Sequence, residues 1–119
     1  MHIEAIREYC LQKKGAIETF PFDESTLVFK VMDKMFALAP LERLPAQVNL
    51  KCDPEKAIEL RETFDGVVLP GYHMNKKHWN TVILNNLEAR EYKEMIDHSY
   101  NLVVAKLTKK QKEALAAIE

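Results

Sequence analysis

The residues best suited to chemistry stand together between Gly71 and Thr81. This stretch holds the only tryptophan of the chain, Trp79, together with two histidines, two lysines and two asparagines, and it contains no acid. Amides and imidazoles exchange hydrogen bonds, ammonium groups attract phosphate, and an indole ring offers a face for stacking. The combination is typical of a surface that contacts another molecule. The alternative is that Trp79 packs in the core and the lysines are ordinary solvated surface.

Neither a metal site nor a catalytic group is predicted. His73 and His78 are five residues apart, which on a strand directs them to opposite faces, and neither Cys-x-x-Cys nor His-Glu-x-x-His occurs. Cys10 and Cys52 each fall on an apolar stripe, where a buried small hydrophobe is the common role. The glutamates recur at helical intervals beside basic residues, as on solvated helix faces. We therefore expect no cofactor, no metal and no catalytic residue.

Lysines are distributed unevenly along the chain. The 71–81 stretch carries a charge of +2, and residues 106–113 carry +3, from four lysines and one glutamate. If these groups converge with Lys51, they form a surface suited to phosphate, with asparagine amides and the indole left to meet bases or sugars. This interpretation predicts that four side chains share one exposed face: Lys51, Lys76, Lys77 and Trp79.

Length and composition limit the class of protein. The chain has 119 residues, of which 47% are hydrophobic and 29% charged, and its net charge is −1. We expect a single domain over residues 1–119 with one core. The charge argues against nucleic-acid binding by bulk charge but leaves a local patch open. No apolar run is long enough for a membrane span and no signal peptide is apparent, so we expect a cytoplasmic monomer with free thiols.

Hydrophobic periodicity predicts an α+β fold. Helices are expected over 2–13, 53–64, 87–106 and 108–117, and strands over 26–32, 35–39, 47–52, 67–69 and 78–84. The first three strands are joined by turns too short for a parallel crossover, so the sheet should be mostly antiparallel. Gln47, Asn49 and Lys51 form the polar side of the third strand, which predicts one wet sheet face with helices on the other. The expected architecture is a two-layer α–β sandwich.

Several element ends carry signals of their own. Asp53 before Pro54 predicts the start of the second helix, Thr108 with Gln111 matches a capping box, and Gly15 suits a left-handed cap after the first helix. Asn85 and Asn86 are expected to cap the long helix that follows them. In the second helix, Ile58 is expected to be buried.

Six segments recur together in an order and spacing that point to a known family. They are TFPF at 19–22, LVFKV at 27–31, KMFAL at 34–38, VNLKCDP at 48–54, PGYHMNKKHWNT at 70–81 and DHSYNLV at 97–103. Over nearly the whole chain they resemble the MmcQ/YjbR family of small bacterial proteins. The clear departure is Asp33, where a glycine-containing turn is usual in that family.

The resemblance implies a fold like that of CyaY and frataxin, and a DNA-binding role of the double-wing type. Our leading hypothesis is accordingly a DNA-binding domain that is not an enzyme. The family's two best-marked motifs fall on nine candidate nucleic-acid-binding residues: Asn49, Lys51, His73, Asn75, Lys76, Lys77, His78, Trp79 and Asn80. Iron binding of the frataxin kind is not expected, because the first helix mixes its acids with basic residues.

Two other functions stay open at this stage. One is a protein-interaction module that uses the exposed face of the sheet. The other is a small-molecule-binding domain around Tyr72, His73 and Trp79.

Overall fold

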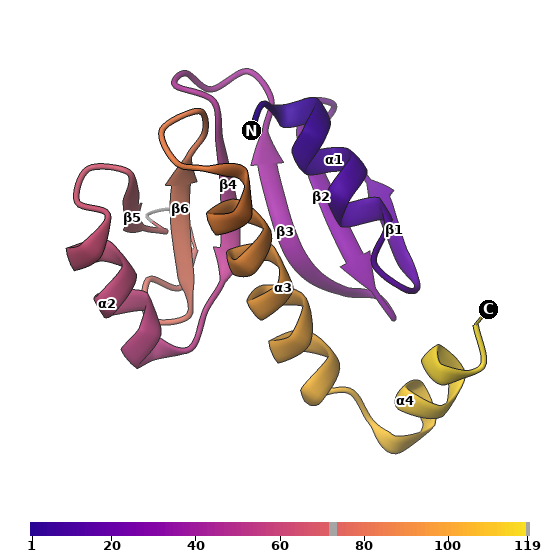
Figure 1. Ribbon diagram of the computed structural model, residues 1–119. Coiled ribbons are helices and arrows are strands. Elements are labelled where there is room, and N and C mark those ends of the chain that lie inside the picture. Colours follow the sequence, from indigo (N-terminus) through magenta and orange to yellow (C-terminus); the bar gives the residue numbers. More distant parts are fainter. Residues whose placement is uncertain (72–73, 119) are drawn as a thin grey trace.

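The computed structural model describes residues 1–71 and 74–118 and has an α+β fold (Figure 1). The elements are α1 (Ile3–Leu11), β1 (Ala16–Thr19), β2 (Thr26–Val31), β3 (Lys34–Pro40), β4 (Gln47–Lys51), α2 (Pro54–Thr63), β5 (Val68–Pro70), β6 (Trp79–Ile83), α3 (Ala89–Ala105) and α4 (Lys109–Ala116). Within the described residues the strands form one six-stranded sheet in the order β1-β2-β3-β4-β6-β5, and each neighbouring pair is antiparallel. The predicted α+β class and the mostly antiparallel sheet are confirmed.

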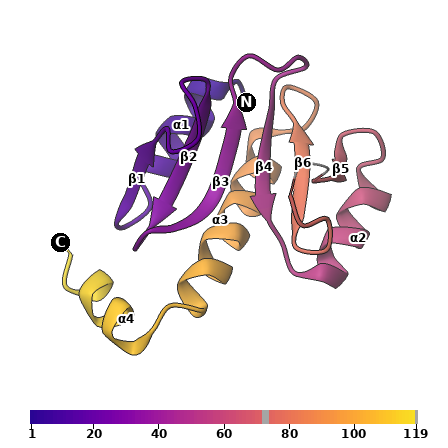
Figure 2. The ribbon, with the colours of Figure 1, turned by 180° about the vertical axis from the view of Figure 1, so that it is seen from behind.

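The helices are arranged so that one face of the sheet is left open. Figure 1 shows α1, α2 and α3 in front of the strands, and Figure 2, from behind, shows the strands with the helices on the far side. Helix α4 follows α3 and extends beyond the end of the sheet. The predicted two-layer sandwich is therefore correct, and the helix-free face is available for function.

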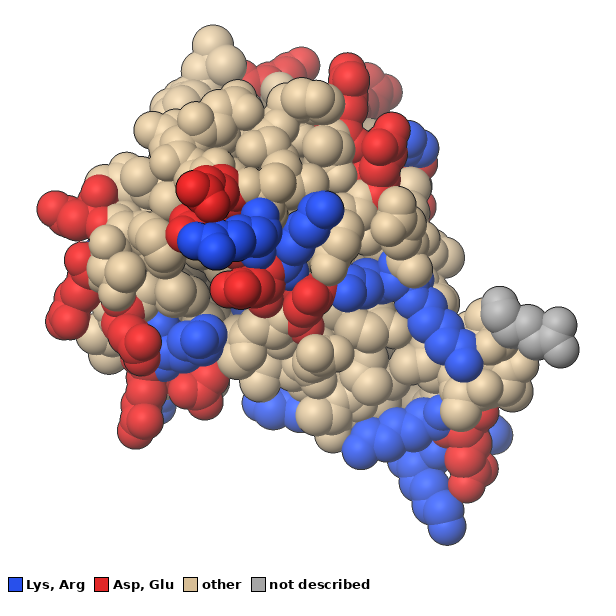
Figure 3. All heavy atoms as spheres, in the orientation of Figure 1, with Lys and Arg blue, Asp and Glu red and all other residues tan. Residues whose placement is uncertain are grey.

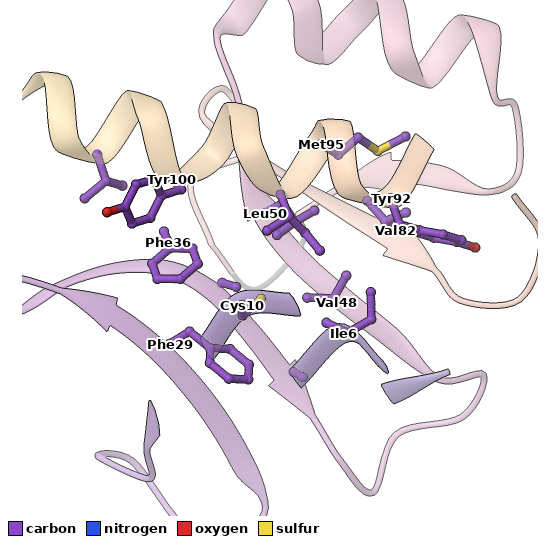
Figure 4. Close-up of a cluster of buried hydrophobic side chains, with 14 of the residues drawn as sticks. Ile6, Cys10, Phe29, Phe36, Val48, Leu50, Val82, Tyr92, Met95 and Tyr100 are labelled. Atoms are coloured by element: carbon purple, nitrogen blue, oxygen red, sulfur yellow. The ribbon is translucent and has the colours of Figure 1, made fainter. Parts of the chain in front are cut away.

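The core lies between the sheet and helices α1 and α3. Apolar residues recur on α3 at helical spacing, so that one stripe of the helix is buried. Figure 4 shows these side chains meeting those of α1 and of the central strands. The ring of Tyr100 on α3 meets Phe36 on β3 edge to face, with 5.4 Å between ring centroids. Members of this core from the helix layer and the sheet include Ile6, Cys10, Phe29, Phe36, Val48, Leu50, Tyr92, Met95 and Ile96.

Most of the predicted helix ends are confirmed. The carboxylate of Asp53 accepts a hydrogen bond from the Lys56 amide at the start of α2. Thr108 and Gln111 exchange both bonds of the capping box before α4. Gly15 has a φ of +74°, the left-handed conformation that glycine adopts without strain.

Two local predictions were wrong. The first concerns the start of α3, where we expected Asn85 or Asn86 as the cap. The N-cap residue is Glu88, and no side chain caps this helix. Instead, the Tyr92 hydroxyl accepts from the backbone N–H groups of Asn86 and Leu87 at 3.0 and 3.1 Å. In α2, Ile58 is 55% exposed, and the buried position is Ala57. Helix α2 packs at the edge of the sheet near β5, so only a narrow stripe of its surface is buried.

Strand β1 was not predicted. It is an edge strand of four residues that pairs with β2 through Ala16 opposite Val31. Its outward residue Ile17 is largely exposed, so the strand lacks the alternation of apolar and polar residues that marks a half-buried strand. A bidentate ion pair from Arg7 to Glu18, with both N–O distances 2.6 Å, joins it to α1.

Candidate functional site

The helix-free face of the sheet contains a pocket of about 540 Å³. Its floor comes from strands β2, β3, β4, β5 and β6, and its sides come from the loops at 20–25, 41–46 and 74–78. The described lining residues are Phe22, Thr26, Met35, Leu38, Pro40, Arg43, Gln47, Asn49, Leu69, Met74, Asn75, Trp79 and Thr81. The pocket is thus mostly apolar and aromatic, with a few amide and hydroxyl groups among these side chains.

The pairing of β4 with β6 decides which side chains enter the pocket. Asn49 lies opposite Thr81, and Val48 lies opposite Val82. Because side chains alternate across a strand, the valines enter the core and the polar pair faces the helix-free side. The Thr81 hydroxyl donates to the Asn49 side-chain oxygen at 2.5 Å, and the Asn49 amide points to the Leu38 carbonyl at 3.5 Å. This pair is therefore part of the pocket floor and is hydrogen-bonded internally.

The loop before β6 is held in shape by Asn75. The Asn75 backbone oxygen accepts from the N–H groups of His78 and Trp79 at 3.0 and 2.9 Å. Its side-chain oxygen accepts from the Lys77 N–H at 3.0 Å. The loop turns back on itself, with Lys76 and Lys77 exposed beside the pocket and His78 half-buried.

Gly71, which follows β5, allows the backbone there to approach Trp79 of β6 closely. Its N–H donates to the Trp79 carbonyl at 3.0 Å. A Cβ at this position would lie 3.0 Å from both the Cβ and the carbonyl oxygen of Trp79. Trp79 is 8% exposed and lines the pocket from this clamped position.

Asn80 faces the opposite side of the sheet from Trp79. It is 2% exposed, its side-chain oxygen accepts from Nε of Arg61 at 2.7 Å, and its amide donates to the Ala57 carbonyl at 3.3 Å. Arg61 also donates to the Lys76 carbonyl. The Asn80 amide therefore joins α2 to β6 and, through Arg61, to the 74–78 loop. The sequence identified Asn80 as a contact residue, but its hydrogen-bonding groups are used inside the protein.

Lys51 borders a second hollow, of about 380 Å³, on the helix-bearing side between α2 and α3. Burial, and then the nearby charge of Lys106, lower the pKa of its amine. His98 lines the same hollow and accepts from the Asp53 N–H through Nε2 at 3.2 Å, and burial lowers its pKa. In the β4–β6 pairing Lys51 lies directly opposite Trp79, so the two residues belong to the same face of the sheet at the end of β4, where Trp79 is 8% exposed.

The cysteines are free and buried, as expected. Burial raises the pKa of the Cys10 thiol to about 12 and that of Cys52 to about 11, so neither supplies a thiolate near neutral pH.

The predicted residues thus separate into groups. Asn49, Asn75 and Trp79 meet in the pocket on the helix-free face, and the loop of Lys76, Lys77 and His78 lies next to it. Lys51 lies opposite Trp79 at the end of β4 and also borders the hollow on the helix-bearing side, whereas Asn80 faces α2. His73, like Tyr72, falls outside the described residues. Sequence reasoning missed Arg43, Gln47, Thr81 and the apolar lining. Alternation marked Gln47 as an outward residue, but it did not show that β4 pairs with β6.

The described lining residues of the pocket carry amide, hydroxyl, guanidinium, thioether and aromatic groups. Among the described lining residues there is no carboxylate, histidine or cysteine, and Arg43 is the charged one. In residues 1–71 and 74–118, no group of three His, Cys, Asp or Glu side chains could hold a metal ion. None of the helices in these ranges is both long and apolar enough to cross a membrane.

Charges on the helix-bearing face are mixed. Figure 3 shows acidic and basic side chains interspersed over that face, with lysines gathered around α4. The lysines of α4 thus lie at the far end of the molecule from the 74–78 loop, as the ribbon in Figure 2 shows.

Comparison with known proteins gives consistent relatives. The YjbR family model matches residues 11–102. The uncharacterized protein YjbR of Escherichia coli K12 is 34% identical over 120 residues, which cover 99% of this chain and 100% of that protein. The crystal structure of Deinococcus radiodurans protein DR2400 has a TM-score of 0.88 at 40% identity, covering 97% of this chain and 88% of that one. A Pseudomonas syringae crystal structure has a TM-score of 0.72 at 31% identity, covering 86% and 98%.

Proposed function

Since the chain belongs to the YjbR family, whose relatives above give a fold and no ligand, we propose from its pocket that it is a DNA-binding protein. In this proposal the DNA lies against the helix-free face of the sheet. The observation that carries it is the pocket itself, which is lined by an indole and by side-chain amides and has basic residues at its margin. Aromatic rings and amides suit bases, and basic groups at the margin suit phosphates.

The basic groups define where the phosphates would run. Lys76 and Lys77 are exposed on the 74–78 loop, and Arg43 lies in the pocket lining. The loop at 20–25 carries Asp23 and Glu24, both exposed. A strand is therefore expected to follow the 41–46 and 74–78 loops and to avoid the acidic side. The loops at 41–46 and 74–78 would act as the two wings around the bound DNA.

Salt dependence tests this proposal. Three basic contacts predict that log K for a short single-stranded oligonucleotide falls with log salt with a slope of about −2, at about 0.7 for each phosphate. Fluorescence anisotropy of a labelled oligonucleotide between about 50 and 200 mM salt measures this slope. Replacing Lys76 and Lys77 together by Gln should lower its magnitude to about 0.7.

The matched control replaces Lys109 and Lys110 of α4 by Gln, which removes the same charge far from the pocket. This variant should bind with the wild-type slope. Equal losses in the two double variants would mean that net charge alone drives the binding. Absence of binding by the wild-type protein at low salt would refute the proposal.

A second candidate is favoured by the size and lining of the pocket. A volume of about 540 Å³ with mostly apolar walls and a few polar groups is typical of sites for small molecules. In that case a planar ligand without phosphate binds, and its affinity does not depend on salt. A ligand screen followed by Trp79 emission, repeated at low and high salt, separates the two functions.

A further inference from the structure

Two polar side chains of the pocket have no partner inside the protein. Gln47 and Trp79 are each 8% exposed, and neither the Gln47 amide nor the Trp79 indole N–H makes a hydrogen bond in the described structure. Every described side-chain nitrogen or oxygen that is sealed from solvent has a hydrogen-bond partner. The Gln47 amide and the Trp79 indole N–H have none, so both are accessible from solvent. Both residues line the pocket. Gln47 also borders a hollow of about 40 Å³ beside Ile3 and Leu41, which is too small for more than a water molecule.

The contrast with the neighbouring polar pair is informative. Asn49 and Thr81 lie between Gln47 and Trp79 on the same face and satisfy each other. Because the Gln47 amide and the Trp79 indole N–H reach open space without a protein partner, a ligand in the pocket can exchange hydrogen bonds with them. The pocket is therefore arranged to receive polar edges at its two ends and flat apolar surface between them.

The register sets the distance between those ends. Trp79 lies opposite Lys51, and Gln47 lies four residues earlier on the same strand. At about 3.4 Å per residue the two backbone positions are about 14 Å apart along the sheet. This span exceeds the width of one base, and we expect it to leave room for two neighbouring bases of an extended strand.

We infer that the pocket binds two consecutive unpaired bases, one against the Trp79 ring and the next at the Gln47 amide. This inference rests on the proposed DNA-binding function and adds the part of the nucleic acid that is recognised. The Gln47 amide offers a donor and an acceptor side by side, which matches the edge of an unpaired base. In a duplex those edges are paired and the base faces are stacked, so single strands should bind in preference.

The test compares ligands of increasing length. Dinucleotides with a 5′-phosphate should quench Trp79 emission and bind at least about tenfold tighter than mononucleotides, because a second base adds stacking and hydrogen bonds. Gln47→Leu should weaken dinucleotide binding about tenfold. Gln47→Glu, which keeps the shape but removes the donor, should weaken it as well. Gln12→Leu, the same change at the exposed residue that follows α1, should have no effect.

The outcomes distinguish this inference from the proposed function. Equal affinity for mono- and dinucleotides would overturn the two-base arrangement. A second outcome is that oligonucleotides bind with the expected salt slope, but duplex and single strands bind alike, Trp79 emission does not change and the Gln47 variants have no effect. In that case the protein contacts only phosphates, and the inference is wrong. If no oligonucleotide binds in a salt-dependent way, the proposed function itself is refuted.

Discussion

Replacing Asn80 by Ala should destabilise the protein strongly while leaving the pocket side chains in place. The substitution removes the acceptor of the Arg61 Nε–H, a bond of 2.7 Å from a charged donor, which is worth about 1.5–3 kcal/mol. It also removes the 3.3 Å donor to the Ala57 carbonyl, for which about 0.5–1 kcal/mol is reasonable. The expected loss is therefore about 2–4 kcal/mol out of a total stability of about 5–15 kcal/mol.

Urea unfolding followed by circular dichroism measures this loss. With a slope of about 2 kcal/mol per molar urea, the midpoint should fall by about 1–2 M. A cycle of Asn80→Ala, Arg61→Ala and the double variant isolates the pair, and its coupling should exceed about 1 kcal/mol. Asn101→Ala, on the exposed side of α3, is the control and should change stability little.

The reasoning about Asn80 fails in either of two cases. Single effects that add without coupling would mean that the hydrogen bond to Arg61 contributes nothing. A stable Asn80→Ala protein that has lost all DNA binding would mean that Asn80 contacts the ligand directly, as its sequence motif suggests.

Three further changes are predicted. Asp33→Gly should raise the free energy of unfolding by about 0.5 kcal/mol in urea titrations, because Asp33 has a φ of +66°, which glycine adopts without strain; an unchanged midpoint would contradict this. Gly71→Ala should destabilise by about 1–3 kcal/mol and shift Trp79 emission, because the new methyl group meets the Trp79 backbone at 3.0 Å; unaltered emission would contradict it. Burial lowers the pKa of His98, so the unfolded chain binds a proton at this residue more readily than the folded protein does. The free energy of unfolding should therefore fall as pH drops from above about 6.5 through the lower folded-state pKa. His98→Gln, whose side chain can still accept the hydrogen bond from the Asp53 N–H, should remove part of this pH dependence in urea titrations between about pH 8 and pH 5.5.

The sequence predicted the elements whose burial is set locally. Helix α3 buries a continuous stripe under Tyr92 and Tyr100, and α4 begins at a capping box, so periodicity and local hydrogen bonding are sufficient. Strand β1 and the exposure of Ile58 were missed because both depend on position at the rim of the fold. A short edge strand is recognised only from its pairing with a neighbouring strand. The small buried area of α2 is likewise apparent only from its position beside β5.

The site was predicted in part for a similar reason. Trp79 and Asn80 are adjacent in a motif, so sequence reasoning treated them as partners in one contact. Alternation alone places them on opposite faces, but only the position of α2 shows that the Asn80 face is closed and the Trp79 face is open. Gln47 was out of reach because its part in the pocket depends on the pairing of β4 with β6, across more than thirty residues of chain.

The polar residues on these two faces of the sheet differ in whether the stability of the fold accounts for them. Asn80 has both of its polar groups occupied, and Asn75 shapes a loop, so their presence is accounted for by stability. Gln47 has no such account, because its amide makes no hydrogen bond within the described structure although the residue is only 8% exposed. Residues that break a local rule without a gain in stability are expected at functional sites. The end of the pocket at Gln47, which lies outside the sequence motif, is therefore as strong a reason to look for a ligand here as the tryptophan within it.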